Sequence, residues 1–121
     1  MGAGCGGSSS STLNDCTTFA DHTAASDPRS VTFGVDGLVY SPKCMEIAAG
    51  QTVTFNGDFA AHPLAPGTSP SAQTAGSANN PIVTPDFTST SAPFTFPTAG
   101  SYPYYCKNHF GAGMNGVIKV H

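Results

Sequence analysis

The stretch Tyr104–Met114 reads Tyr-Tyr-Cys-Lys-Asn-His-Phe-Gly-Ala-Gly-Met, with a thiol, an imidazole and a thioether at the spacing C-x-x-H-x-x-x-x-M. Cys106 offers a soft thiolate, His109 a borderline nitrogen and Met114 a weak sulfur ligand. A trigonal site of two His and one Cys with a long axial Met is the geometry of blue copper electron transfer. The stretch therefore predicts a copper-binding loop that needs one further His.

His62 is the expected second imidazole. It follows the strand-like segment Gln51–Phe55, and enough chain separates it from Cys106 to cross a β-sandwich and return. A single Cys or Met is often only a core residue, but the joint spacing is hard to explain by packing. Zinc also binds Cys and His, yet a thioether is a poor zinc ligand, so copper is favoured. We expect the other histidines, His22 and His121, to have no metal role.

These residues resemble those of cupredoxins, closest to the plastocyanin and pseudoazurin group. The resemblance covers roughly residues 30 to 121 and rests on Gly50–Phe55, His62, Phe94–Tyr102 and Tyr105–Gly116. It implies one copper ion per chain, with His62, Cys106, His109 and Met114 as its ligands. The group usually has Asn directly after the first ligand His, where this chain has Pro63.

The composition is typical of one turn-rich β domain. The chain has 121 residues, 14 Gly and 10 Pro, and only 9% of its residues are charged, against a typical quarter. Four Lys and Arg with a net charge of −3 provide no basic patch that could neutralise phosphates. Nucleic acid is therefore not expected as a partner.

Short apolar runs separated by Gly and Pro predict an all-β, Greek-key sandwich, cupredoxin-like, of about seven to eight strands. Residues 63–81 hold several prolines and are expected to form a long surface loop that can contain one short helical turn. The expected strands are Val31–Phe33, Leu38–Tyr40, Val53–Phe55, Ile82–Val83, Phe94–Phe96, Tyr102–Cys106 and Val117–Val120.

Side-chain alternation places Cys106 and Tyr104 on one face of their strand and Tyr105 on the other. If the thiolate faces the interior, Tyr105 faces outward. Tyr105 also resembles the plastocyanin residue near a remote surface where electrons enter, although an exposed Tyr on a strand is ordinary. Tyr102 is similar to the tyrosine-corner residue of Greek-key proteins, which has a structural role.

Uncharged residues are expected around His109, including Phe110, Ala112, Leu64 and Pro66. They form either a docking patch for a redox partner or simply the end of the core. Pro63 and Asn108, the chain neighbours of His62 and His109, are expected to lie just behind the ligands.

Small residues before Cys5 and a Gly/Ser run after it resemble a bacterial lipoprotein cleavage site, although an incidental Cys in a disordered tail is the alternative. Residues 1–14 are expected to be a flexible tether and residues 15–121 the domain. A disulfide between Cys16 and Cys44 is favoured, against two free thiols or a pairing of Cys5 with either. No apolar run approaches the roughly 20 residues of a membrane-spanning helix, so we expect a soluble chain.

The function expected from these observations is one-electron transfer between protein partners outside the cytoplasm, by a monomeric carrier that is not an enzyme. The copper would cycle between Cu(II) and Cu(I). A lipid on Cys5 would tether the protein to a membrane. The alternative is a module for copper storage or delivery, although such modules tend to be Met- and His-rich and this chain has three Met residues. Multicopper enzymes need His-x-His pairs, which the sequence lacks.

Overall fold

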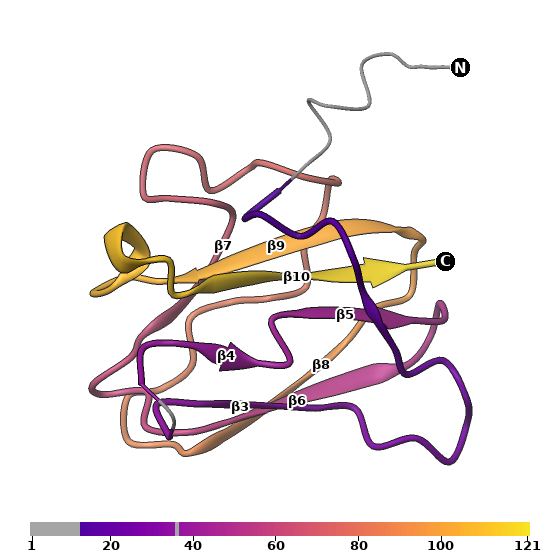
Figure 1. The fold of residues 1–121 in the computed structure, drawn as a ribbon, viewed down its shortest axis with the longest axis horizontal. Coiled ribbons are helices and arrows are strands. Elements are labelled where there is room, and N and C mark those ends of the chain that lie inside the picture. The colour runs from indigo at the N-terminus through magenta and orange to yellow at the C-terminus, as the bar shows by residue number, and fades with distance from the viewer. Residues whose placement is uncertain (1–12, 36) are drawn as a thin grey trace.

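Two mixed β-sheets pack face to face in the computed structural model, which describes residues 13–35 and 37–121 (Figure 1). One sheet has the strand order β2 (Ala20–Asp21), β5 (Cys44–Ile47), β10 (Asn115–Val120), β9 (Gly100–Cys106) and β7 (Leu64–Pro66). The other has the order β4 (Tyr40–Ser41), β3 (Ser30–Phe33), β6 (Thr52–Asn56) and β8 (Ser91–Thr95). The predicted all-β sandwich is confirmed.

Helix is scarce in the described residues, where one 3-10 helix, Phe110–Ala112, follows β9. None of the helices in this part of the chain is long and apolar enough to cross a membrane.

The core lies between the sheets and follows the strand period of two. In β9, Tyr102, Tyr104 and Cys106 all face this core and are 2% exposed or less. Facing positions on other strands are equally apolar and buried, among them Val31, Phe33, Met45, Ile47, Val53, Phe55, Ile118 and Val120. Burial of alternate apolar side chains therefore fixes which face of each strand points inward.

The strand directions bring several loops to one end of the sandwich. β3 and β6 run parallel, so their last residues lie at the same end, and β9 ends beside the start of its antiparallel neighbour β10. The 3-10 helix after β9 and the end of β3 both lie toward the left end of the view in Figure 1. The C-terminus lies toward the other end.

Tyr102 forms the tyrosine corner that its sequence context suggests. Its hydroxyl donates to the Thr98 carbonyl at 2.7 Å, four residues upstream, and its ring packs against Phe96. The contact fixes the turn that feeds β9.

Several expected strand positions are wrong. Ile82–Val83 is irregular, because Pro81 lacks an N–H and the Ile82 N–H is taken by the Asn80 side chain at 3.0 Å. Leu38–Val39 belongs to a turn, and the strand begins only at Tyr40. Three strands lie outside the expected runs, namely β2, β5 and β7.

Residues 63–81 are not simply a surface loop. Leu64–Pro66 forms β7 and pairs with β9, with Leu64 opposite Cys106 and Ala65 opposite Tyr105. The rest of this segment, residues 67–81, lies within the described part of the chain and forms no helical turn. The loop lies so close to β9 that a Cβ on Gly76 would come 2.6 Å from the Ser101 carbonyl oxygen. It therefore covers the outer face of the strand that ends at Cys106.

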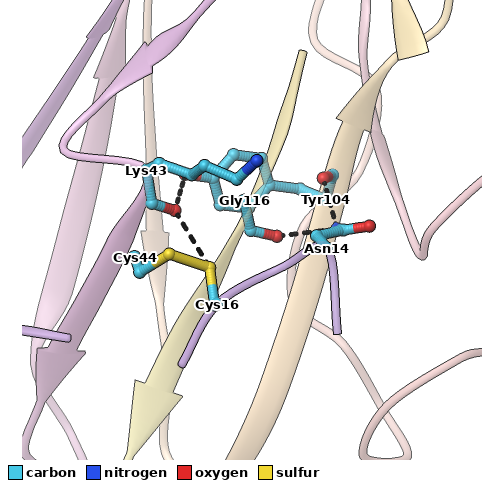
Figure 2. Close-up of a disulfide and its surroundings, with 6 residues drawn as sticks. All are labelled: Asn14, Cys16, Lys43, Cys44, Tyr104 and Gly116. Atoms are coloured by element: carbon cyan, nitrogen blue, oxygen red, sulfur yellow. Dashed lines mark hydrogen bonds between the residues drawn. A yellow bond between two sulfur atoms is a disulfide. The ribbon is translucent and has the colours of Figure 1, made fainter. Parts of the chain in front are cut away.

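The segment before β2 is attached to the sheet by a disulfide between Cys16 and Cys44, whose Cα atoms are 5.7 Å apart (Figure 2). The Asn14 amide donates to the carbonyls of Tyr104 at 3.0 Å and Gly116 at 2.9 Å. These two residues face each other on β9 and β10. The segment thus clamps the pair of strands that lead to and from the copper-loop sequence.

Asn14, which the sequence places in the tether, bonds to the sheet. Leu13 also belongs to the folded part, because its carbonyl accepts the Cys16 N–H at 2.9 Å. Cys5 and residues 1–12 of the expected tether lie outside the described residues.

Removal of the disulfide is expected to lower the free energy of unfolding by roughly 3 to 4 kcal/mol, because a cross-link over 28 positions restricts the unfolded chain. The double variant Cys16→Ser/Cys44→Ser, compared with wild type by denaturant unfolding, measures the loss. Thr18→Ser, an exposed change in the same segment, is the control. Non-reducing peptide mapping that finds both thiols free in the wild type would end this interpretation.

Candidate metal centre

Three potential ligand atoms meet at the loop end of the sandwich. His62 Nδ1 lies 3.2 Å from His109 Nδ1, and Cys106 Sγ lies 3.8 Å from His62 Nδ1 and 3.6 Å from His109 Nδ1. Both imidazoles are partly buried and Cys106 is fully buried. In the described part of the chain, this is the one group of three or more His, Cys, Asp or Glu side chains close enough to hold a metal ion.

The triangle has the size that a metal ion requires. Imidazole nitrogen and thiolate sulfur lie about 2.0 and 2.3 Å from a divalent ion such as zinc. In a trigonal plane these lengths separate two nitrogens by roughly 3.5 Å and nitrogen from sulfur by roughly 3.7 Å. The three observed separations, 3.2, 3.8 and 3.6 Å, fit this arrangement with only small adjustments of the side chains.

His62 is placed by a tight turn after β6. Its N–H donates to the Asp58 carbonyl at 2.9 Å, and the Asp58 carboxylate accepts the Ala60 N–H at 2.9 Å. The ring packs edge-on against Phe33 and lies over Gly34. A Cβ on Gly34 would lie 3.0 Å from His62 Cδ2, so the glycine makes room for the imidazole.

Cys106 and His109 are placed by a loop closed with backbone hydrogen bonds. The Cys106 N–H donates to the Met114 carbonyl at 2.9 Å, and the Met114 N–H donates to the His109 carbonyl at 3.2 Å. The Ala112 N–H donates to the same His109 carbonyl at 3.0 Å. Gly113 closes the 3-10 helix in the left-handed region, at φ +87°, where glycine is favoured. The loop therefore returns the chain from Cys106 to β10 in a fixed shape.

Met114, the expected axial ligand, is fully buried directly before β10 and belongs to the apolar core. Its backbone contacts with Cys106 and His109 keep it beside the ligand loop.

Comparison with known proteins decides the family. The family described as copper binding proteins, plastocyanin/azurin family, matches residues 29–121. The chain belongs to this family. The expected cupredoxin resemblance is thereby confirmed, and the family together with the cluster of His62, Cys106 and His109 shows copper as the cofactor, one ion per chain.

Individual relatives share the fold. Chloroplastic plastocyanin of Physcomitrium patens is 38% identical over 92 residues, which are 72% of this chain and 54% of that protein, so the chain spans about half the length of this curated relative. The structure of plastocyanin from Dryopteris crassirhizoma matches with a TM-score of 0.53 and 23% identity, over 76% of this chain and 99% of that one. A copper-containing nitrite reductase from Thermus scotoductus matches with a TM-score of 0.56 and 26% identity, over 78% of this chain and 22% of that one.

The charge state of His62 suits this cupredoxin's cofactor. Burial lowers the pKa of the His62 imidazole below its ordinary value, and the neighbouring His109 lowers it further, while the Asp58 carboxylate opposes the shift. A lower pKa favours the neutral ring, and only the neutral ring can donate a lone pair to copper.

Tyr105 points away from Cys106, as the alternation predicts, but the expectation that it reaches the surface is wrong. Its side chain is fully buried. Gln73, from the loop that covers β9, donates to its hydroxyl at 3.0 Å, and Phe110 packs edge-on against its ring at a centroid distance of 5.7 Å. The sequence does not predict this cover, because it indicates only a surface loop for residues 63–81.

The expected docking residues divide into two groups. Phe110 is 37% exposed and Ala112 is exposed, so both are accessible beside His109. Leu64 is fully buried and cannot contribute to a docking surface, and Pro66 is half-buried. Leu64 is buried because it lies on the inward face of β7 and packs in the core.

Three exposed apolar residues at the same end escaped the sequence analysis. Val35, Leu38 and Val39 are 73%, 40% and 46% exposed in the turn that begins at Gly34, beside His62. The sequence predicts a strand at Leu38 and Val39, so their exposure does not follow from it. The Asp36-Gly37 pair before them was the available turn signal.

Replacing Gly34 by Ala is expected to disturb the copper site as well as stability. The backbone at φ +75° costs a non-glycine residue about 1 to 2 kcal/mol, and the new Cβ would press on the His62 ring. Gly37→Ala is the matched control, because its φ is +103° but nothing lies within 4 Å of its Cβ. Unfolding and Cu(II) absorption of both variants are compared. A Gly34→Ala spectrum equal to that of Gly37→Ala would contradict the steric role.

Proposed function

We propose that this cupredoxin is an electron carrier with a type 1 copper site, and that it exchanges single electrons with protein partners. The observation that carries the proposal is the triangle of His62 Nδ1, Cys106 Sγ and His109 Nδ1 at one end of a closed sandwich. When bound, copper supplies the one-electron couple between Cu(II) and Cu(I).

Each residue of the site has a distinct role in this proposal. His62, Cys106 and His109 would hold the copper through two imidazole nitrogens and a thiolate, and Met114 would add a weak thioether ligand that tunes the potential. The Cys106 sulfur provides the strongest electronic path into the protein, through β9. His109 provides the path to a partner, because its ring is only partly buried and Phe110 and Ala112 beside it are accessible.

The surrounding structure favours rapid electron transfer because it resists movement of the ligands. Cys106 is fully buried, and its backbone is bonded on both sides within the loop and β9. His62 is confined by Gly34 and Phe33. Ligands that hold similar positions in both oxidation states need little reorganisation.

The docking surface in this proposal is apolar. It comprises Phe110 and Ala112 with Val35, Leu38 and Val39 from the turn beside His62. None of these five side chains is charged, although Asp58 acts on His62 and the exposed Lys107 lies in the same loop as Phe110 and Ala112. A partner would therefore be held mainly by apolar contact rather than steered by charge.

A location outside the cytoplasm is part of the proposal. The disulfide between Cys16 and Cys44 supports it, because such bonds persist in oxidising compartments. An N-terminal lipid on Cys5 would tether the carrier to a membrane, and the mass of the protein isolated from its native membrane tests this.

Cu(II) added to the reduced-thiol protein is expected to give an intense blue charge-transfer band, because the Cys106 thiolate would bind copper within a trigonal plane. Cys106→Ser should abolish the band. Lys107→Ala, an exposed change at the next position, should retain it. Optical and electron paramagnetic titration provides the measurement.

A colourless complex with an ordinary tetragonal copper signal would reject the proposed site. Storage or delivery is the alternative function, and it predicts rapid loss of copper to a chelator. The full burial of Cys106 and Met114 favours slow loss instead.

Pro63 is expected to lower the reduction potential, because it has no N–H that could donate to the Cys106 sulfur. Among the described residues, this sulfur lies within hydrogen-bonding distance of the two ring nitrogens and of no backbone N–H. Pro63→Ala restores the donor. If the added bond favours Cu(I) by about 1 kcal/mol, the potential rises by roughly 40 mV.

Voltammetry of Pro63→Ala against wild type measures the shift. The control is Pro66→Ala, at a half-buried proline three positions further along the chain. An unchanged or lower potential in a Pro63→Ala protein with an intact blue spectrum would refute this role for Pro63.

A further inference from the structure

We propose that Asn108 is a positioning residue of the copper site, whose side-chain amide fixes His62 against the loop that carries Cys106 and His109. The inference rests on the proposed function, since it concerns the same ligands. Asn108 acts through His62 and is not itself a ligand.

Two hydrogen bonds hold the His62 turn to the ligand loop. The Asn108 Nδ2 donates to the Ala61 carbonyl at 3.1 Å, and the Lys107 backbone N–H donates to the Pro63 carbonyl at 2.8 Å. The accepting residues are the two chain neighbours of His62. The donating residues are the two that separate Cys106 from His109. The pair of bonds therefore forms a bracket around His62, and it fixes the ligand that is most distant in sequence from the other three.

The direction of these bonds follows from Pro63. A proline after His62 can accept a hydrogen bond but cannot donate one. The N–H of His62 is already used within its own turn, by the Asp58 carbonyl at 2.9 Å. Residues 62 and 63 thus provide no backbone donor toward the ligand loop, and both observed bonds are donated from that loop. Lys107 and Asn108 supply it.

Of the two hydrogen bonds in the bracket, the one donated by the Asn108 side chain can be removed by a substitution. Lys107 donates through its backbone, which every non-proline residue would retain. The Asn108 side chain is exposed, so its truncation leaves no cavity in the core. It also leaves all four proposed ligands unchanged. Without the amide, the His62 turn would be held to the loop by the Lys107 bond and, beyond it, by the pairing of β7 with β9.

The test compares Asn108→Ala with Lys107→Ala, an exposed neighbour whose backbone donor survives. In the metal-free protein, the amide at position 107 should exchange its hydrogen faster in Asn108→Ala than in wild type, because the bracket opens more often. In the Cu(II) protein, Asn108→Ala should release copper to a chelator faster, by the factor of roughly 2 to 12 that one hydrogen bond represents. Its blue band and electron paramagnetic spectrum should also shift.

Lys107→Ala should match wild type in all three measurements. Asn108→Ala values equal to those of Lys107→Ala would overturn the positioning role. The hydrogen-exchange result does not depend on copper. A wild-type protein that forms no blue complex would therefore reject the proposed function. Hydrogen exchange of the amide at position 107 would still show whether the Asn108 bond holds the His62 turn to the ligand loop.

Discussion

The copper site depends on one constraint, the approach of His62 to Cys106, whose ligand atoms lie 3.8 Å apart although 44 positions separate the two residues. Cys106 and His109 belong to one short loop, but His62 comes from the opposite sheet's connection to β7. The sandwich must therefore hold its two sheets in a fixed relation at this end. The pairing of Leu64 with Cys106, two positions after His62, provides the most direct link, because it joins the His62 segment to the strand of the thiolate.

The contacts that hold Cys106 in place beside His62 extend along β9 and β10 into the body of the sandwich. The Tyr104 hydroxyl donates to the Lys43 carbonyl at 3.1 Å, and burial raises the pKa of this phenol, so it remains a donor. Gly116 makes this contact possible, since a Cβ there would lie 2.3 Å from the Tyr104 hydroxyl oxygen. Lys43 precedes the disulfide residue Cys44 (Figure 2). The segment with Asn14 and Cys16 and the copper loop thus contact the same two strands, β9 and β10. Rigid packing at one end of these strands therefore also restricts movement at the other end.

The sequence predicts the local parts of the site well and the long-range parts poorly. The fold class, the copper loop and the inward face of Cys106 follow from spacing and from a period of two, which are properties of neighbouring residues. The short strands β2 and β7 do not follow, because two or three residues carry no periodic signal and their pairing depends on the sheet edge available. The burial of Leu64 and Tyr105 is a consequence of β7 and its loop, so the sequence predicts neither. Gly34 was not recognised for the same reason, since its partner His62 is distant in sequence.

The cover over Tyr105 has a consequence for the route of electrons. Tyr105 lies directly beside Cys106 in the chain, but Gln73 and Phe110 separate its side chain from solvent. A partner that delivered electrons through Tyr105 would therefore touch the loop around Gln73 rather than the phenol itself. The His109 end needs no such intermediate, because the imidazole is partly exposed and Phe110 is accessible beside it. Phe110 contacts the Tyr105 ring and also forms part of the docking surface, so the two routes converge on one side chain.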